Sequence, residues 1–266
     1  MHGDRLIDGD LLKWRDSELT MIRSDGRALD EVRPIRFAPG YLPFAEGSVL
    51  IELGETRVIC AASVEETSPP FLRGTGVGWI TAEYRMLPRA TKQRTSRDSA
   101  GRVDGRSVEI QRLVGRSLRA AIDRAQLGER TVIIDCDVTN ADGGTRTAAI
   151  TGGFVALALA CDKLRSSGAL VTTPVIRQVA AISAGVLNGT PILDLTYEED
   201  SVADADGNFV LTNRGETVEL QLSAERSLPT TEQVEDVRRL AQIGVDHMLR
   251  AQRALLAQYA PGVLQT

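Results

Sequence analysis

Short runs of apolar and β-branched residues, separated by polar turns, predict strands along much of the chain. The predicted strands are 47–53, 56–64, 79–84, 131–138, 179–187, 191–197 and 217–224. Gly54-Glu55 and Asn188-Gly189 are two-residue turns between neighbouring runs, so each predicts a β-hairpin. The pairs Asp206-Gly207 and Arg214-Gly215 are interpreted as turns that bracket one further short strand.

Apolar residues recur at helical spacing in three segments, 107–127, 145–165 and about 230–259. The first is amphipathic, and Gly128 ends it. The second contains seven consecutive apolar residues, 154–160, which cover every face of a helix. We therefore expect this helix to be buried, against a sheet or against a second subunit.

Two parts of the chain, about 47–127 and about 178–258, show the same order of elements: a hairpin, a further strand and an amphipathic helix. Strands mixed with helices and joined by hairpins predict an α+β fold in which helices lie on sheets. The repeated order also suggests a duplication, a hypothesis that fails if the strand order differs between the two halves.

Composition limits the class of protein. The 266 residues carry a formal charge of −5, with 42% hydrophobic and only 4% aromatic residues, so the core is aliphatic and general nucleic-acid binding is disfavoured. The three cysteines form no C-x-x-C pair, which disfavours zinc and fits reduced thiols. We expect no membrane span and no signal peptide, and hence a cytoplasmic location.

One stretch departs from this acidic average. Residues 85–106 hold seven arginines and lysines against two aspartates, a local charge of +5. Such clustering suits a polyanion, because each neutralised phosphate releases counterions. A solvated loop with ion-paired arginines fits the same pattern, and the charge alone leaves both alternatives open.

The stretch 135–150, DCDVTNADGGTRTAAI, joins a predicted strand to the apolar helix through Gly143 and Gly144. Unpaired N–H groups and a positive dipole at a helix N-terminus attract anions, and Arg146 adds a planar set of donors. Phosphate is the natural ligand of such a corner. An ordinary strand-to-helix turn capped by Asp142 explains the same residues.

Two groups of carboxylates could do chemistry. Asp135 and Asp137 share one face of a strand. Asp194 and Asp200 belong to a later acidic cluster, and in an extended chain they would lie roughly 20 Å apart, too far to share one ion. Spacing therefore cannot identify a metal site, and from the residues alone the favoured interpretation of each acid is a solvated or hydrogen-bonded structural carboxylate.

Taken in order, six segments make the chain similar to the ribonuclease PH family of bacterial phosphorolytic exoribonucleases, relatives of archaeal exosome subunits and polynucleotide phosphorylase. The segments are SDGRALDEVRPI, AEGSVLIELGETRVICAASVEE, GWITAEYRMLPRAT, GRSVEIQRLVGRSLRAAID, DCDVTNADGGTRTAAITG and ILDLTYEEDSVADAD. The resemblance covers about residues 22–256. It implies the ribosomal-protein-S5-domain-2-like fold, as a single domain over 22–259 between an N-terminal extension, 1–21, and a C-terminal tail, 260–266.

The resemblance also implies a reaction, in which inorganic phosphate attacks the last phosphodiester of an RNA 3′ end and releases a nucleoside diphosphate. Precursors of tRNA, and other RNA 3′ ends, are the implied substrates, and a homohexamer built as a trimer of dimers is the implied assembly. The attack of one anion on another requires charge neutralisation, which arginines, a helix N-terminus and a divalent cation such as Mg²⁺ supply.

Site residues follow from the same resemblance. Arg106 and the corner Gly144, Thr145 and Arg146 match the family's phosphate-binding positions. Asp194 and Asp200 match its paired aspartates, which implies catalysis and divalent-cation binding. Three further arginines match basic loop residues linked to RNA binding and subunit contacts: Arg89, Arg94 and Arg97.

Two larger residues, Leu222 and Arg226, stand where the family has glycine in a QGTAEG-like run, and Arg85 replaces another glycine. These departures keep open a second hypothesis, that of a catalytically impaired ring subunit that binds RNA. A small-molecule phosphate-binding enzyme is a third, but it poorly explains the local charge of +5.

Overall fold

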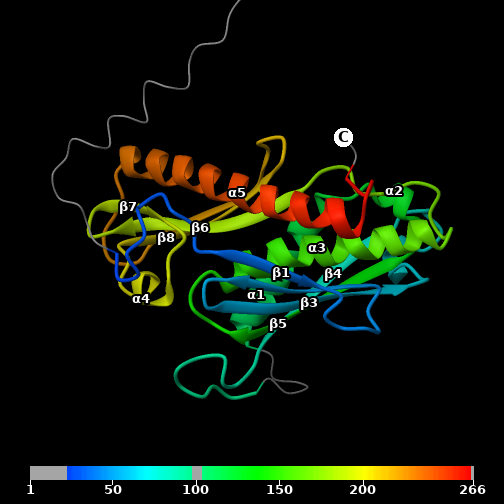
Figure 1. Cartoon of the computed structure of the whole chain (residues 1–266), viewed down its shortest axis with the longest axis horizontal. Coiled ribbons are helices and arrows are strands. Elements are labelled where there is room, and N and C mark those ends of the chain that lie inside the picture. The colour runs from blue at the N-terminus through cyan, green and yellow to red at the C-terminus, as the bar shows by residue number, and fades with distance from the viewer. Residues whose placement is uncertain (1–22, 98–103, 265–266) are drawn as a thin grey trace, which may run out of the picture.

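The computed structural model describes residues 23–97 and 104–264 (Figure 1). The predicted extension, 1–21, and the last two residues of the predicted tail lie outside the described residues. The elements are β1 (Ile35–Pro39), β2 (Gly47–Leu53), β3 (Thr56–Glu65), the 3-10 helix η2 (Pro70–Leu72), β4 (Trp79–Met86), α1 (Gly105–Arg119), α2 (Arg124–Leu127), β5 (Thr131–Asn140), α3 (Thr145–Ser166), β6 (Val179–Leu187), β7 (Thr190–Leu193), α4 (Tyr197–Asp200), β8 (Ala205–Thr212), β9 (Thr217–Ala224) and α5 (Thr231–Tyr259).

The strands form two sheets. The first has five strands in the order β1-β2-β3-β5-β4, antiparallel except for the parallel pair β4 and β5. The second has four antiparallel strands in the order β7-β6-β8-β9. Both predicted hairpins are confirmed, as β2-β3 and β6-β7. The predicted α+β class is therefore confirmed.

Helix α3 lies between the two sheets (Figure 1). It packs on β2 and β3 of the first sheet and on β6 of the second, while α1 lies beside it and α5 packs on β6, β7 and β8. Its side chains from Phe154 to Ala158 are fully buried, as the uninterrupted apolar run predicts. By length and composition α3 could span a membrane, but 83% of its most apolar window is buried inside the protein.

The two halves both contain a sheet and a covering helix, but they are not strand-for-strand copies. In the first half, β5 separates the β2-β3 hairpin from β4, whereas in the second half β8 pairs directly with β6. A duplication with the same strand order is therefore contradicted. The predicted helix 107–127 is also divided: α1 ends at Arg119, and the Asp123 side chain caps α2 by accepting from Ala125 and Gln126 N–H groups.

Candidate active site

A cavity of about 750 Å³ lies where the N-termini of α1 and α3 meet the second sheet. Its walls come from segments far apart in the sequence. They are the end of β4, the loop residues 91–96, the start of α1, the corner 143–146, α4, β8 and the residues after β9. The fold thus brings the predicted corner, Arg106 and Asp200 together around one space.

The corner before α3 requires its two glycines. Gly143 and Gly144 have φ of 75° and 64°, in the left-handed region that favours glycine. A Cβ on Gly143 would lie 2.4 Å from the Leu195 carbonyl oxygen, so no side chain fits there. Gly144 caps α3 without a side-chain hydrogen bond, which leaves the N–H groups of the first turn available to a ligand.

Side chains complete an electropositive wall at this corner. The Tyr84 hydroxyl donates to Thr145 Oγ1 at 2.8 Å, and burial raises the pKa of Tyr84, so it stays a neutral donor. Arg146 Nη1 lies 3.4 Å from both Glu109 Oε1 and Gln221 Oε1. Arg106, in the first turn of α1, lines the same cavity. All four predicted phosphate-binding residues therefore meet in one place.

Two carboxylates face this wall, Asp200 from the end of α4 and Asp206 from β8. Asp200 opens into the cavity, yet burial by the cavity walls and the charge of Asp206 raise its pKa against the opposing effect of Arg106 and Arg146. Burial and Glu225 likewise raise the pKa of Asp206. Because Asp206-Gly207 has the sequence of a turn, Asp206 was not predicted as a site residue, although it is within β8.

The structure corrects the position of Asp194. Its side chain is fully buried and does not line the cavity. Arg33 donates to it from Nε at 2.9 Å, from Nη2 at 2.7 Å and from the backbone N–H at 2.8 Å. Arg27 Nη1 lies 3.2 Å from the same carboxylate. With both oxygens bonded to arginine, Asp194 is not accessible to a metal ion or to RNA.

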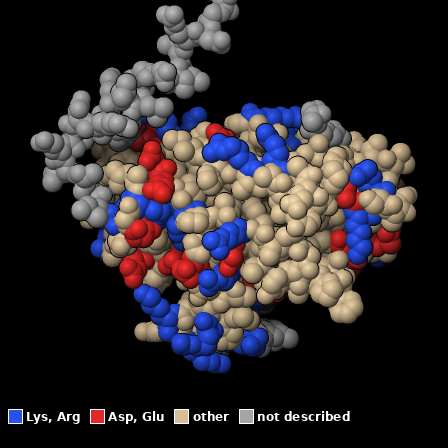
Figure 2. Space-filling view, in the orientation of Figure 1, with Lys and Arg blue, Asp and Glu red and all other residues tan. Residues whose placement is uncertain are grey.

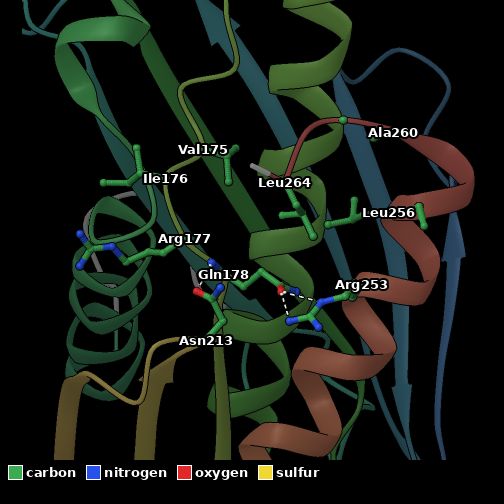
Figure 3. Close-up of a pocket in the computed structure, with 11 residues that line it drawn as sticks. Val175, Ile176, Arg177, Gln178, Asn213, Arg253, Leu256, Ala260 and Leu264 are labelled. Carbon is green, nitrogen blue, oxygen red and sulfur yellow. Dashed lines mark hydrogen bonds between the residues drawn. The ribbon is translucent and has the colours of Figure 1, made fainter. Parts of the chain in front are cut away.

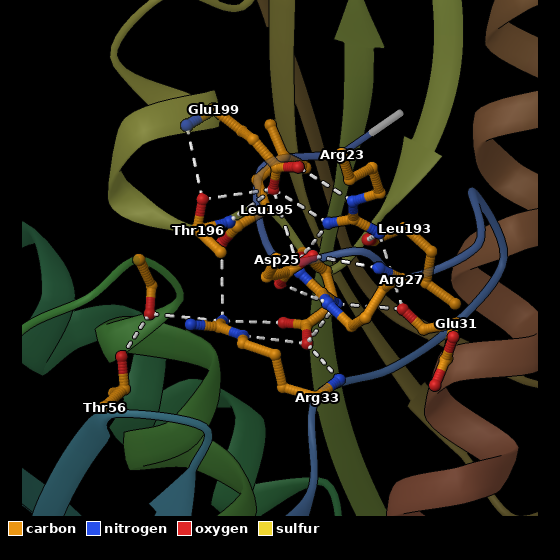
Figure 4. Close-up of polar contacts among 12 residues, drawn as sticks. Arg23, Asp25, Arg27, Glu31, Arg33, Thr56, Leu193, Leu195, Thr196 and Glu199 are labelled. Carbon is orange, nitrogen blue, oxygen red and sulfur yellow. Dashed lines mark hydrogen bonds and ion pairs between the residues drawn. The ribbon is translucent and has the colours of Figure 1, made fainter. Parts of the chain in front are cut away.

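Asp194 belongs to an ionic cluster that we define as Arg23, Arg27, Arg33, Asp194 and Glu199 (Figure 4). Arg23 binds both Glu199 oxygens, at 2.7 and 2.8 Å. Arg33 also donates to the Asp142 and Gly143 carbonyl oxygens. The cluster therefore ties the N-terminal segment to α4 on one side and to the glycine corner on the other.

The chain reverses between β7 and α4, which separates Asp194 from Asp200. Asp194 itself has φ of 53°, and Thr196 then begins α4 with a reciprocal hydrogen-bonded cap to Glu199. The predicted strand 191–197 ends at Leu193 for this reason.

The basic loop lies beside the cavity. Arg89, Arg94 and Arg97 are exposed in the loop between β4 and α1, while its Thr91, Thr95 and Ser96 line the cavity. Figure 2 shows Lys and Arg side chains gathered on this loop, at the bottom of the view. Arg89 Nη1 donates to the Lys92 carbonyl oxygen at 3.1 Å, so Arg89 also shapes the loop.

The other candidate carboxylates, Asp135 and Asp137, do not line this cavity. Burial raises the pKa of both, and Arg85 opposes that rise at Asp137. A second cavity of about 440 Å³ contains none of the predicted site residues (Figure 3). Its Gln178 Oε1 accepts from Arg253 Nε and Nη2 at 3.4 and 3.2 Å.

Both halves of the chain match a known family. Residues 31–161 match domain 1, and residues 177–244 match domain 2, of the 3′ exoribonuclease family. The chain belongs to this family. Residues of both matched regions line the cavity, and the first region includes most of α3.

Relatives in the family are similar over nearly their whole length. The chain is 52% identical to Ribonuclease PH of Cereibacter sphaeroides over 236 residues, which are 88% of this chain and 100% of that protein. It is 51% identical to Ribonuclease PH of Roseobacter denitrificans over 237 residues, with 89% and 100% covered.

Solved structures show the same fold. The archaeoglobus fulgidus exosome with RNA bound to its active site aligns with a TM-score of 0.72, 23% identity, and coverage of 91% of this chain and 95% of that one. Rice Rrp46 aligns with a TM-score of 0.71, 19% identity, and coverage of 88% and 100%.

Three residues, Arg85, Leu222 and Arg226, differ from the family pattern, and they leave the cavity open. The Leu222 side chain packs against the buried apolar cluster of the second sheet and is not part of the cavity wall. Arg226 does line the cavity, and its Nη2 donates to the Ser201 carbonyl oxygen at 3.2 Å. Arg85 donates to Gln111 Oε1 and to the Tyr84 carbonyl oxygen. Of these three, only Arg226 alters the surface that a ligand would meet.

Proposed function

We propose that this protein is a phosphate-dependent 3′-5′ exoribonuclease that removes nucleotides from RNA 3′ ends as nucleoside diphosphates. The observation that carries the proposal is the cavity, in which the α3 N-terminus, Arg106 and Arg146 face Asp200 and Asp206. The helix N-terminus and the arginines suit an attacking anion, and the two carboxylates suit a divalent cation and the transfer of a proton to the departing oxygen.

Phosphate would lie on the N–H groups of Thr145 and Arg146, with the two arginine side chains neutralising its charge. Its oxygen attacks the terminal phosphorus, the bond to the 3′ oxygen of the preceding nucleotide breaks, and that oxygen takes up a proton. Phosphate is already ionised at neutral pH and needs no strong base. Asp200, which lines the same cavity, is the proposed source of this proton.

A divalent cation, Mg²⁺ by its preference for carboxylate and phosphate oxygens, is part of the proposal. Asp200 and Asp206 would hold it, since they line one cavity and their mutual repulsion would be relieved by a cation. Among the described residues no group of three or more His, Cys, Asp and Glu side chains could hold a metal. The fit is therefore to an ion that keeps waters or phosphate oxygens as its other ligands, and its charge would stabilise the transition state.

We propose tRNA precursors as substrates, on the name of the relatives and on the basic loop beside the cavity. Arg89, Arg94 and Arg97 would bind the RNA backbone, where neutralised phosphates contribute most of the affinity. A homohexamer, as a trimer of dimers, is proposed from the same family membership. A cytoplasmic location is proposed from the three buried, unpaired cysteines, which suit a reducing compartment.

The test is to incubate the protein with a 3′-extended tRNA, Mg²⁺ and inorganic phosphate, and to identify the released nucleotides. Nucleoside diphosphates that appear only with phosphate are expected. Nucleoside monophosphates, or release that ignores phosphate, would refute phosphorolysis. Binding of the RNA without any release would instead support a catalytically impaired ring subunit.

A further inference from the structure

One hydroxyl beside the cavity lacks a partner. Ser183 lies in β6, in the apolar run VAAISAGVL, and is 6% exposed. Its Oγ is buried and has no hydrogen-bond partner among the described residues, yet Ser183 is part of the cavity wall. An unpaired buried hydroxyl destabilises the protein, because it has lost its hydrogen bonds to water without gaining others. A bound ligand that accepts its hydrogen bond would remove this cost.

The position of Ser183 indicates that such a ligand would lie beside the N-terminus of α3. Its Oγ would be 3.7 Å from a Cβ placed on Gly144, the residue that caps α3. The neighbouring hydroxyls of the corner each make one hydrogen bond: Thr145 Oγ1 accepts from Tyr84 and keeps its own O–H to donate, and Thr147 Oγ1 donates to the Gly144 carbonyl oxygen at 2.9 Å. Ser183 Oγ, in contrast, is buried beside the same turn and has no hydrogen-bond partner among the described residues.

The second sheet continues this polar surface away from Ser183. Ser183 pairs with Asn208 across β6 and β8, and Asn208 pairs with Gln221 across β8 and β9. Residues directly opposite on neighbouring strands share a face of the sheet. Asn208 also lines the cavity, and Gln221 Oε1 lies 3.4 Å from Arg146 Nη1. The polar side chains of Ser183, Asn208 and Gln221 therefore form a line across the sheet, which begins near Gly144 and ends near Arg146.

We propose that Ser183 Oγ donates a hydrogen bond to an oxygen of the inorganic phosphate held at the α3 N-terminus. This rests on the proposed function, and it adds a residue from the second sheet to a phosphate site otherwise built from α1 and the glycine corner. The burial of Ser183 and its proximity to Gly144 favour phosphate over RNA, because the N–H groups of the first turn of α3 are the proposed phosphate site.

The test compares Ser183→Ala with Ser117→Ala. Ser117, in α1, is also fully buried with an unpaired Oγ, but it does not line the cavity. A hydrogen bond to a charged group contributes about 1.5–3 kcal/mol, so Ser183→Ala should raise the KM for phosphate about 10- to 100-fold. The KM for RNA should stay unchanged, and Ser117→Ala should alter neither constant.

A binding measurement without RNA separates this inference from the proposed function. Titration with inorganic phosphate alone should show the same 10- to 100-fold weakening for Ser183→Ala. At zero phosphate the melting temperature of Ser183→Ala should equal or exceed that of the wild type, because the hydroxyl that is removed is buried without a partner.

Equal phosphate affinity in the two variants would overturn the role of Ser183. A higher KM for RNA with an unchanged KM for phosphate would also overturn it, because the hydroxyl would then serve the RNA. Absence of phosphate-dependent release by the wild type would instead overturn the proposed function, while the phosphate titration would still decide the role of Ser183.

Discussion

Two groups of arginine and aspartate or glutamate side chains each take one carboxylate from α4, and they differ in how their charges are compensated. In the ionic cluster, each carboxylate is buried and bonded to arginine. In the cavity, Asp200 and Asp206 line the same space as Arg106 and Arg146, and no ion pair joins these described side chains. The charges of the first group neutralise one another inside the fold, whereas the charged side chains of the second group line a cavity and are available to a ligand.

The contrast is sharpest between two adjacent residues. Burial disfavours the ionised form of Glu199, but hydrogen bonds from Arg23 overcome it and lower the pKa of Glu199. Burial and the charge of Asp206 raise the pKa of Asp200. One short helix thus carries a structural carboxylate and a functional one, and only the partners that the fold provides tell them apart.

The largest expected effect on stability is that of Asp194→Asn. This change leaves Arg33 and Arg27 buried with a neutral partner, and breaking a buried pair costs about 3–5 kcal/mol. Asparagine tolerates the positive φ of Asp194, so backbone strain adds little. Urea denaturation should show the loss. A free energy of unfolding equal to that of the wild type would make Asp194 a candidate functional residue again.

The next comparison is between Asp200→Asn and its neighbour Glu199→Gln. Asp200→Asn should lower turnover about 10²- to 10³-fold, the typical loss for one charge-stabilising group, with the melting temperature preserved. Glu199→Gln should lower the melting temperature and leave turnover of the folded fraction near normal. Rates and melting curves on the same preparations provide the check, and the reverse assignment would break the comparison.

A smaller effect is expected from Arg94→Ala with Arg97→Ala, in the basic loop. Removing one arginine–phosphate interaction reduces the slope of log affinity against log salt by about 0.7 to 0.9, so the double change should reduce it by about 1.5. Affinity for a 3′-extended tRNA should be measured at several salt concentrations, with Arg36→Ala in β1 as the control. An unchanged slope would exclude both arginines from the RNA interface.

The smallest effect is on the pH dependence of stability. Asp206 has a raised pKa in the folded state, so the folded protein binds this proton more tightly than the unfolded chain does. Stability from Asp206 is therefore present in acid and is lost as pH rises through its folded pKa. Asp206→Asn should stabilise the protein more at about pH 7.5 than at about pH 4.5. Denaturation at the two pH values would show an opposite trend if Asp206 were paired like Glu199.

Much of the fold could be predicted from the sequence because its signals are local. Alternation, Gly54-Glu55 and Asn188-Gly189 predict both hairpins, and the run 154–160 predicts a buried helix. Local signals missed β1, since 24–46 is polar and rich in turns, and missed the break between α1 and α2. Strand order depends on contacts between distant segments, which is why the order of elements along the chain overstates the likeness of the two halves.

For the site, the glycine corner and Arg106 could be predicted, but the acidic partner of Asp200 could not. Asp194 and Asp206 each stand six residues from Asp200, one before it and one after it. Spacing cannot choose between them, since the choice depends on Arg23, Arg27 and Arg33, which come from the other end of the chain. A lone serine in an apolar strand was the available signal for Ser183.

The most direct test of the central claim is phosphate-dependent release of nucleoside diphosphates by Asp206→Asn, corrected for the folded fraction. We predict a fully folded variant whose turnover falls about 10²- to 10³-fold, because the cavity loses a carboxylate that faces the phosphate wall. A folded Asp206→Asn variant with near-normal turnover would contradict the assignment of Asp206 as the partner of Asp200.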